Sequence, residues 1–92
     1  MIRKKVIVTG GAGDIGRNVC DYFLANNYSV VQTGLNNEEL SDLKNDNVNL
    51  SLELLDVTNE KSTDNLINKH PEFYALINLA GVNFHKKEFD IK

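Results

Sequence analysis

A glycine-rich segment near the beginning of the chain has the residue types and spacing of a phosphate-binding turn. Residues 9–16 read TGGAGDIG, so that Gly10, Gly13 and Gly16 stand three positions apart. Gly10 permits a tight turn, Gly13 leaves the backbone open to a phosphate, and Gly16 lets a following helix pack closely on a sheet. The motif therefore predicts a site where backbone groups hold phosphates.

Phosphate binding at such a turn depends on the helix that follows it. The backbone N–H groups of Asp14 and Ile15 stand at this helix start, where the helix dipole also favours negative charge. The alternative is a glycine-rich turn without a ligand. The position of the motif between an apolar strand and an amphipathic helix favours the ligand. A P-loop is excluded because no Gly-Lys-Ser/Thr sequence follows.

Alternating apolar and amphipathic segments predict the elements that position this turn. The predicted strands are residues 6–8, 28–33, 48–55 and 73–79. The predicted helices follow the glycine turn, cover residues 36–45, and run from Thr58 to about His70. Strands that alternate with helices imply parallel pairing through right-handed crossovers, which is an α/β fold.

Several local signals support these elements. Asn36 and Glu39 have the spacing of a capping box, and Thr58 is the expected N-cap of the third helix. Leu40 and Leu43 are expected to face inward from the second helix. The apolar face of the first helix consists of Ile15, Val19, Cys20, Phe23 and Leu24. One face of the third strand consists of Val48, Leu50, Leu52 and Leu54.

Composition limits the class of protein. The 92 residues suffice for one domain, 1–92, in which we expect residues 83–92 to form a tail or loop. The net charge is −3 with both signs scattered, so we expect no nucleic-acid partner and no membrane partner. Cys20 is the single cysteine and no zinc-ligand spacing occurs, so we expect no metal site and a reducing, cytoplasmic location.

The glycine spacing resembles that of the short-chain dehydrogenase/reductase family. The three-residue repeat is the form of its extended members, such as sugar-nucleotide epimerases and dehydratases, whereas Asp14 occupies the middle glycine of the classical motif. The resemblance implies an NAD(P)-binding, Rossmann-like three-layer α/β fold. Its parallel sheet of four strands would have the order 3-2-1-4, shortened relative to a complete family member.

Two further segments resemble motifs of the same family. Asp56 and Val57 follow the third strand, where the family's carboxylate and next N–H hold adenine; a turn residue or cap is the alternative for Asp56. Asn78, Ala80 and Gly81 resemble the Asn-Asn-Ala-Gly motif, which stabilises the sheet and lies along the cofactor. This second motif is a classical feature, so the subfamily stays open.

The residues at the end of the second strand leave the cofactor as NAD or NADP. No acidic residue stands there for the ribose 2′-hydroxyl, and no Arg or Lys stands there for a 2′-phosphate. Glu38 and Glu39 fit a helix start better, and Arg17 fits a solvated helix position. Asn36 has a side chain that can bind a ribose hydroxyl, although a helix cap is the simpler interpretation.

No catalytic residue is predicted in this chain. The resemblance implies a Tyr-x-x-x-Lys pair with an upstream Ser or Thr, but Asn26, Gln32 and Asn78 stand four residues after the three tyrosines. His85 is interpreted as part of a solvated tail, and His70 as a helix-end residue.

The sequence thus predicts the N-terminal dinucleotide-binding part of an NAD(P)-dependent oxidoreductase, without catalysis on its own. One alternative is a fragment of an extended-type sugar-nucleotide epimerase or dehydratase. Another is a stand-alone nucleotide-binding or self-associating module. The fourth strand, residues 73–79, would be an apolar sheet edge, so we expect a homo-oligomer that pairs through it.

Overall fold

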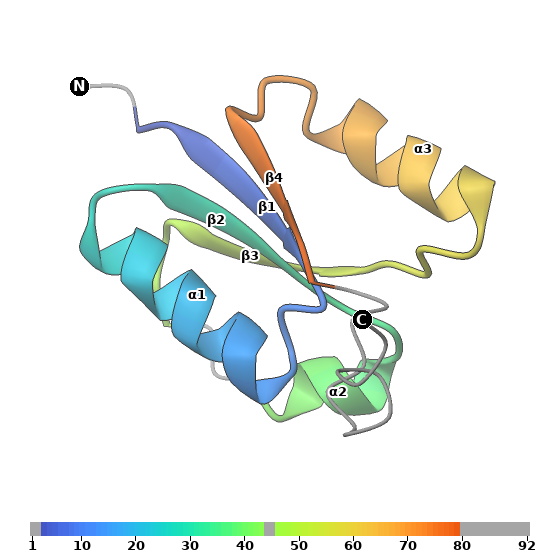
Figure 1. The fold of residues 1–92 in the computed structure, drawn as a ribbon, viewed down its shortest axis with the longest axis horizontal. Coiled ribbons are helices and arrows are strands. Elements are labelled where there is room, and N and C mark those ends of the chain that lie inside the picture. Colours follow the sequence, from blue (N-terminus) through green and yellow to red (C-terminus); the bar gives the residue numbers. More distant parts are fainter. Residues whose placement is uncertain (1–2, 44–45, 80–92) are drawn as a thin grey trace, which may run out of the picture.

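The computed structural model describes residues 3–43 and 46–79, and Figure 1 shows a sheet with helices on both sides. The strands and helices follow in the order β1 (Lys5–Thr9), α1 (Asp14–Ala25), β2 (Ser29–Gly34), α2 (Asn37–Ser41), β3 (Leu50–Leu54), α3 (Glu60–Lys69) and β4 (Ala75–Asn78). The predicted alternation of strands and helices is confirmed. Ala80, Gly81 and the predicted tail 83–92 lie outside the described residues.

The four strands form one parallel sheet with the predicted order β3-β2-β1-β4. Val8 of β1 pairs with Gln32 of β2 on one side and with Ile77 of β4 on the other. All carboxyl ends therefore meet at one edge of the sheet, next to the turn that leads into α1.

The central strand β1 is buried on both faces, as a strand in a parallel sheet must be. Val6 and Val8 face α1, whereas Ile7 faces α3, because successive side chains alternate. The core on the α1 face consists of Val6, Val8, Cys20 and Val30. The core on the α3 face consists of Ile7, Val31, Leu55 and Leu66. Two helix layers thus hold β1 and its turn in place.

The apolar face of α1 differs from the prediction at its first residue. Val19, Phe23 and Leu24 pack around the buried Cys20, as expected. Ile15, however, is 45% exposed, because it lies in the first turn of α1 above the carboxyl ends of the strands. It does not belong to the core.

Two helix boundaries correct the sequence prediction. The N-cap of α3 is Asn59, whose side chain accepts from the N–H groups of Lys61 and Ser62; Thr58 instead donates to Asp56. The second helix, predicted over 36–45, is only Asn37–Ser41. Its predicted cap is confirmed, since Asn36 accepts from the N–H of Glu39.

The third and fourth strands are shorter than predicted. Val48 lies before β3 and is 96% exposed, so it does not share a buried face with Leu50 and Leu52. Leu54 is also half exposed, because β3 forms an edge of the sheet.

In the described ranges 3–43 and 46–79, no helix is long and apolar enough to cross a membrane.

Candidate functional site

The glycine turn between β1 and α1 is the centre of the candidate site. Gly10 has a φ of 68°, a left-handed conformation that glycine adopts without strain. Gly16 lies against the same turn: a Cβ added there would be 2.2 Å from the carbonyl oxygen of Gly10. The tight turn predicted at Gly10 is confirmed. Gly16 allows close packing of α1, but against the glycine turn rather than against the strands of the sheet as predicted.

Packing among the described residues does not require a glycine at position 13. Its φ is −75°, and an added Cβ would meet only the Gly10 oxygen at 3.7 Å, an ordinary contact. Gly13 is the N-cap of α1 and supplies no side-chain cap. Within ranges 3–43 and 46–79, no side chain fills the space beside it, which suits a group from outside the chain.

Three backbone N–H groups point out of the first turn of α1. The first intrahelical bond is donated by Arg17 to Gly13, at 2.8 Å, so the N–H groups of Asp14, Ile15 and Gly16 have no hydrogen-bond partner among the described residues. Unpartnered N–H groups and the helix dipole make this end of α1 suited to an anion.

A cavity of about 330 Å³ lies beside the glycine turn, at the carboxyl ends of β2 and β3. It is lined by Gly10, Thr33, Gly34, Leu35, Glu39, Leu55, Asp56, Val57 and Thr58. The lining includes Gly10 from the phosphate turn and both predicted adenine contacts, Asp56 and Val57. The structure thus brings Gly10 and Asp56, from two motifs that are far apart in the sequence, to one cavity.

Asp56 has a defined geometry in this cavity. Its Oδ1 accepts from the backbone N–H of Thr58 at 3.0 Å and from the Thr58 hydroxyl at 2.6 Å. These hydrogen bonds, that of the hydroxyl first, hold the pKa of Asp56 below its usual value. The carboxylate is therefore ionised and oriented, with an exposed side that can accept a further hydrogen bond.

Glu39 also lines the cavity, which sequence reasoning missed. Its Oε1 accepts from the N–H of Leu35 at 2.7 Å, while its own N–H donates to Asn36. Asn36, predicted as a possible ribose contact, is the cap of α2 and is not among the cavity-lining residues. The capping-box spacing was the available signal, but it did not indicate that this cap faces the cavity.

A smaller cavity of about 180 Å³ lies at the carboxyl ends of β1 and β4. It is lined in part by Thr9 and Asn78, and the Thr9 hydroxyl donates to Asn78 Oδ1 at 2.6 Å. Asn78 therefore ties β4 to β1 beside the glycine turn, the sheet-stabilising position that the resemblance implied.

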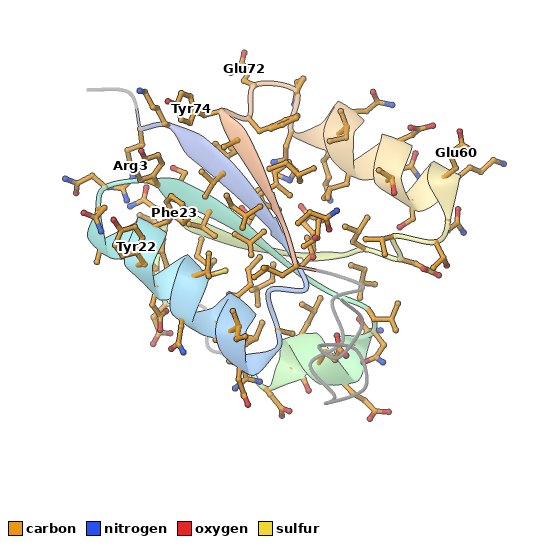
Figure 2. The ribbon with its side chains drawn as sticks, in the orientation of Figure 1. Arg3, Tyr22, Phe23, Glu60, Glu72 and Tyr74 are labelled. Atoms are coloured by element: carbon orange, nitrogen blue, oxygen red, sulfur yellow. The ribbon has the colours of Figure 1, made fainter. Side chains whose placement is uncertain are left out.

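The three tyrosines of the chain lie away from the glycine turn. Tyr22 and Tyr28 each stack edge-on with Phe23, and Tyr28 also contacts Tyr74 at a ring distance of 6.4 Å. Figure 2 shows Tyr22, Phe23 and Tyr74 near the amino-terminal ends of the strands. No tyrosine is thus placed to transfer a proton at the candidate site.

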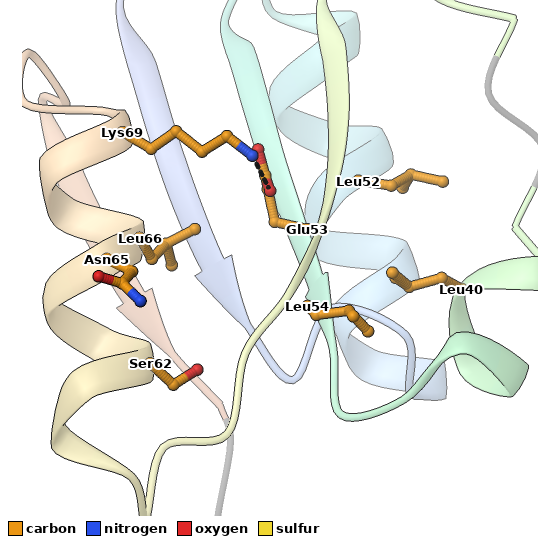
Figure 3. Close-up of a pocket in the computed structure, with 8 residues that line it drawn as sticks. All are labelled: Leu40, Leu52, Glu53, Leu54, Ser62, Asn65, Leu66 and Lys69. Atoms are coloured by element: carbon orange, nitrogen blue, oxygen red, sulfur yellow. Dashed lines mark hydrogen bonds and ion pairs between the residues drawn. The ribbon is translucent and has the colours of Figure 1, made fainter.

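A polar cluster on the α3 face was not anticipated from the sequence. His70 is 8% exposed; its Nδ1 lies 3.2 Å from Lys5 Nζ, and its Nε2 lies 3.0 Å from Glu53 Oε2. The His70 ring thus lies between a lysine ammonium and a carboxylate. Glu53 also pairs with Lys69 at 3.0 Å, across the pocket between β3 and α3 that Figure 3 shows. This cluster joins three elements far from the glycine turn.

Comparison with known proteins decides the family. The model of the NAD dependent epimerase/dehydratase family matches residues 6–91. The chain belongs to this family. No curated protein matches the chain. Among solved structures, Gre2 from Candida albicans in complex with NADPH has a TM-score of 0.77 and 35% identity, and covers 89% of this chain.

Two other solved structures are similar. ElxO with NADP bound has 27% identity and a TM-score of 0.74 over 97% of this chain. A short chain dehydrogenase from Leptospira borgpetersenii, with 22% identity and a TM-score of 0.74, shares the fold. The chain spans only 25% of the Gre2 structure and 42% of ElxO. The predicted relationship to short-chain dehydrogenases/reductases is confirmed.

Proposed function

We propose that this chain binds an NAD(P) dinucleotide, as the N-terminal cofactor-binding part of an oxidoreductase. The proposal rests on the backbone N–H groups of Asp14 to Gly16, which have no partner among the described residues. Beside them stands Gly13, where no described residue would be closer than 3.7 Å to an added Cβ. The family match and the NADPH complex of a similar protein support the same ligand class.

We propose a place for each part of the cofactor from the cavities beside the glycine turn. The pyrophosphate lies at the N-terminus of α1, where the free N–H groups neutralise its charge. The adenosine lies in the 330 Å³ cavity, with Asp56 as acceptor for the adenine amino group and the N–H of Val57 facing the ring. The nicotinamide end extends toward Asn78 and the smaller cavity at β1 and β4. Ala80 and Gly81, which the sequence also predicts as cofactor contacts, lie outside the described residues.

Hydride transfer is not assigned to this chain alone. Its tyrosines lie at the other end of the sheet, and none is followed by a lysine four positions later. We therefore expect cofactor binding without dehydrogenase turnover by the purified chain. Reduction of NAD(P), followed at 340 nm with a panel of alcohols, would contradict this expectation.

Calorimetry with NADH tests the binding proposal. Gly13→Val places a branched side chain in the open space beside the α1 N-terminus, so we expect NADH affinity to fall at least about tenfold. Ala25→Val at the far, exposed end of α1 is the matched control and should bind normally. Unchanged affinity in the Gly13 variant, or no binding by the unaltered chain, would contradict the proposal.

A fragment of an extended-type epimerase or dehydratase is the second candidate. The three-residue glycine spacing and the family model favour it, whereas the Asn-x-Ala-Gly segment favours a classical enzyme. The coding sequence downstream of residue 92 distinguishes the two, because it either continues into the remaining strands of an extended enzyme or does not.

Self-association through β4 is a proposal that exposure supports. Within the described sheet β4 is an edge strand, and its Leu76 is 46% exposed, next to Tyr74 at 61%. Sedimentation at high concentration should show a dimer, and a monomer would contradict self-association.

A cytoplasmic location is likewise a proposal, supported by the free, buried thiol of Cys20.

A further inference from the structure

A buried glutamine lies beside the glycine turn, at a position of β2 where a buried strand would ordinarily carry an apolar residue. Gln32 follows Val30 and Val31 in this strand and is only 4% exposed. Burial of a side-chain amide is unfavourable unless the amide is hydrogen-bonded. The Nε2 of Gln32 donates to the carbonyl oxygen of Gly11 at 2.7 Å, in a hydrogen bond that is itself buried. The buried amide is therefore directed at the backbone of the glycine turn.

Strand β2 holds both polar groups of the peptide unit that joins Gly11 to Ala12. The Gly11 oxygen accepts from the side chain of Gln32. The Ala12 N–H donates to the main-chain oxygen of Thr33 at 3.2 Å. A rotation of this peptide unit would break both hydrogen bonds at once. The two bonds therefore fix the orientation of the turn as well as its position.

The missing side chain of Gly11 makes room for the glutamine. A Cβ added at position 11 would be 2.7 Å from Gln32 Cγ, and 3.2 Å from both Thr33 N and Val8 O. Because Cγ lies in the middle of the glutamine side chain, rotation of the terminal amide cannot relieve this contact. The glycine at position 11 and the glutamine at position 32 are thus fitted to each other.

The first turn of α1 rests directly on the peptide segment that the glutamine holds. A Cβ on Gly16 would be 2.2 Å from the Gly10 oxygen and 2.6 Å from the Gly11 Cα. This turn of α1 carries the N–H groups of Asp14, Ile15 and Gly16, which have no partner among the described residues. A change in the orientation of Gly11 would therefore move the N–H groups that are suited to an anion.

The glycines permit this turn but do not select it. Four of the seven residues 10–16 are glycine, and glycine loses more conformational freedom on ordering than any other residue. A turn that only its ligand ordered would therefore bind that ligand more weakly. We propose that Gln32 is a positioning residue, which holds the Gly11–Ala12 peptide and the first turn of α1 in the pyrophosphate-binding geometry before the ligand binds. This inference rests on the proposed cofactor function.

Titrations with ADP-ribose and with adenosine test the inference, because only ADP-ribose carries the pyrophosphate. Gln32→Met keeps an unbranched side chain but removes the donor, so we expect the affinity for ADP-ribose to fall at least about tenfold. The affinity for adenosine should stay within about twofold, since adenosine does not reach the N–H groups of α1. Gly11→Ala displaces the glutamine from the opposite side and should give the same difference between the two ligands.

Val30→Ala is the matched control for a general loss of stability. Val30 is 1% exposed and lies two residues before Gln32, on the same face of β2. The substitution removes core packing but keeps both hydrogen bonds to the turn. We expect it to leave the affinities for ADP-ribose and adenosine unchanged.

Amide hydrogen exchange gives a second measurement, which needs no ligand. In Gln32→Met the Ala12 N–H should exchange at least about tenfold faster, because the peptide unit is no longer held at its carbonyl oxygen. The N–H of Val6, in the central strand, should change no more in this variant than it does in Val30→Ala.

The possible failures are distinguishable from one another. An unchanged affinity for ADP-ribose in Gln32→Met, or unchanged exchange at Ala12, refutes the positioning role. Equal losses for ADP-ribose and adenosine also refute it, because they indicate a general disturbance of the fold. Absence of ADP-ribose binding by the unaltered chain refutes the proposed cofactor function itself.

Discussion

Adding one methyl group at Gly16 is the sharpest perturbation of the glycine turn. The new Cβ would lie 2.2 Å from the Gly10 oxygen and 2.6 Å from the Gly11 Cα. Both are backbone atoms, so no side-chain rotation relieves the overlap, and α1 must move away from the turn by about an ångström. Overpacking of this kind costs about 1–3 kcal/mol, and more where the neighbours are rigid.

The helix propensity of alanine offsets part of this cost. Alanine is favoured over glycine inside a helix by about 1 kcal/mol. Because the overlap is with backbone, we expect Gly16→Ala to lower the free energy of unfolding by at least about 2 kcal/mol. For a domain of this size that corresponds to a fall in melting temperature of roughly 8–16 °C.

Gly13→Ala is the matched control, since its Cβ would lie 3.7 Å from the nearest atom. We expect a loss below about 1 kcal/mol, which reflects only the weaker N-cap. Urea unfolding followed by circular dichroism measures both variants. A Gly16 variant as stable as the unaltered chain, or equal losses for the two substitutions, would refute the close packing of α1 on the turn.

Three further predictions concern the rest of the fold. Burial raises the pKa of Glu53, but the hydrogen bonds from His70 and Lys69 outweigh it and hold the pKa below its ordinary value. The stability that this carboxylate contributes is therefore present above the ordinary carboxyl pKa and should be lost as the pH falls through the lowered one. Glu53→Gln should weaken the dependence of the unfolding free energy on pH in the acid range, as measured by urea unfolding, whereas Glu72→Gln should leave this dependence unchanged. The same pH dependence in both variants would contradict the cluster. Burial, then the charge of Asp21, raises the pKa of Cys20 to about 12, so a thiol reagent at pH 8 should label it only on unfolding; rapid labelling of the native chain would contradict its burial. Asn59→Ala should cost about 1 kcal/mol in thermal unfolding as an N-cap loss, and an unchanged melting temperature would contradict Asn59 as the cap.

The sequence predicts the order of elements because its apolar runs and glycines carry that information locally. The parallel sheet, the strand order and the cap at Asn36 all agree with the structure. The predicted start of α3 was wrong because Thr58 and Asn59 are adjacent and either can cap a helix. In the structure the Thr58 hydroxyl donates to Asp56, which leaves Asn59 as the N-cap. Val48 was misplaced because alternation continued past the paired part of the strand.

The candidate site was only partly predictable for a different reason. The sequence identifies Gly10 by the glycine spacing and Asp56 by its position after β3. Each residue follows a strand directly, so the local sequence is enough to place it at the cavity. Glu39 reaches the cavity only because Gly34 lets α2 pack closely, which is a tertiary effect. His70 becomes buried because Lys5 and Glu53, distant in the sequence, extend toward it from the sheet.

The most direct test of cofactor binding is an NMR titration of the backbone amides with NADH. If the dinucleotide lies as proposed, the largest shifts occur at the free N–H groups of Asp14, Ile15 and Gly16, with smaller ones at Val57. Largest shifts around the pocket of Figure 3, for example at Asn65, or no shifts at the three glycine-turn amides, would contradict the central claim.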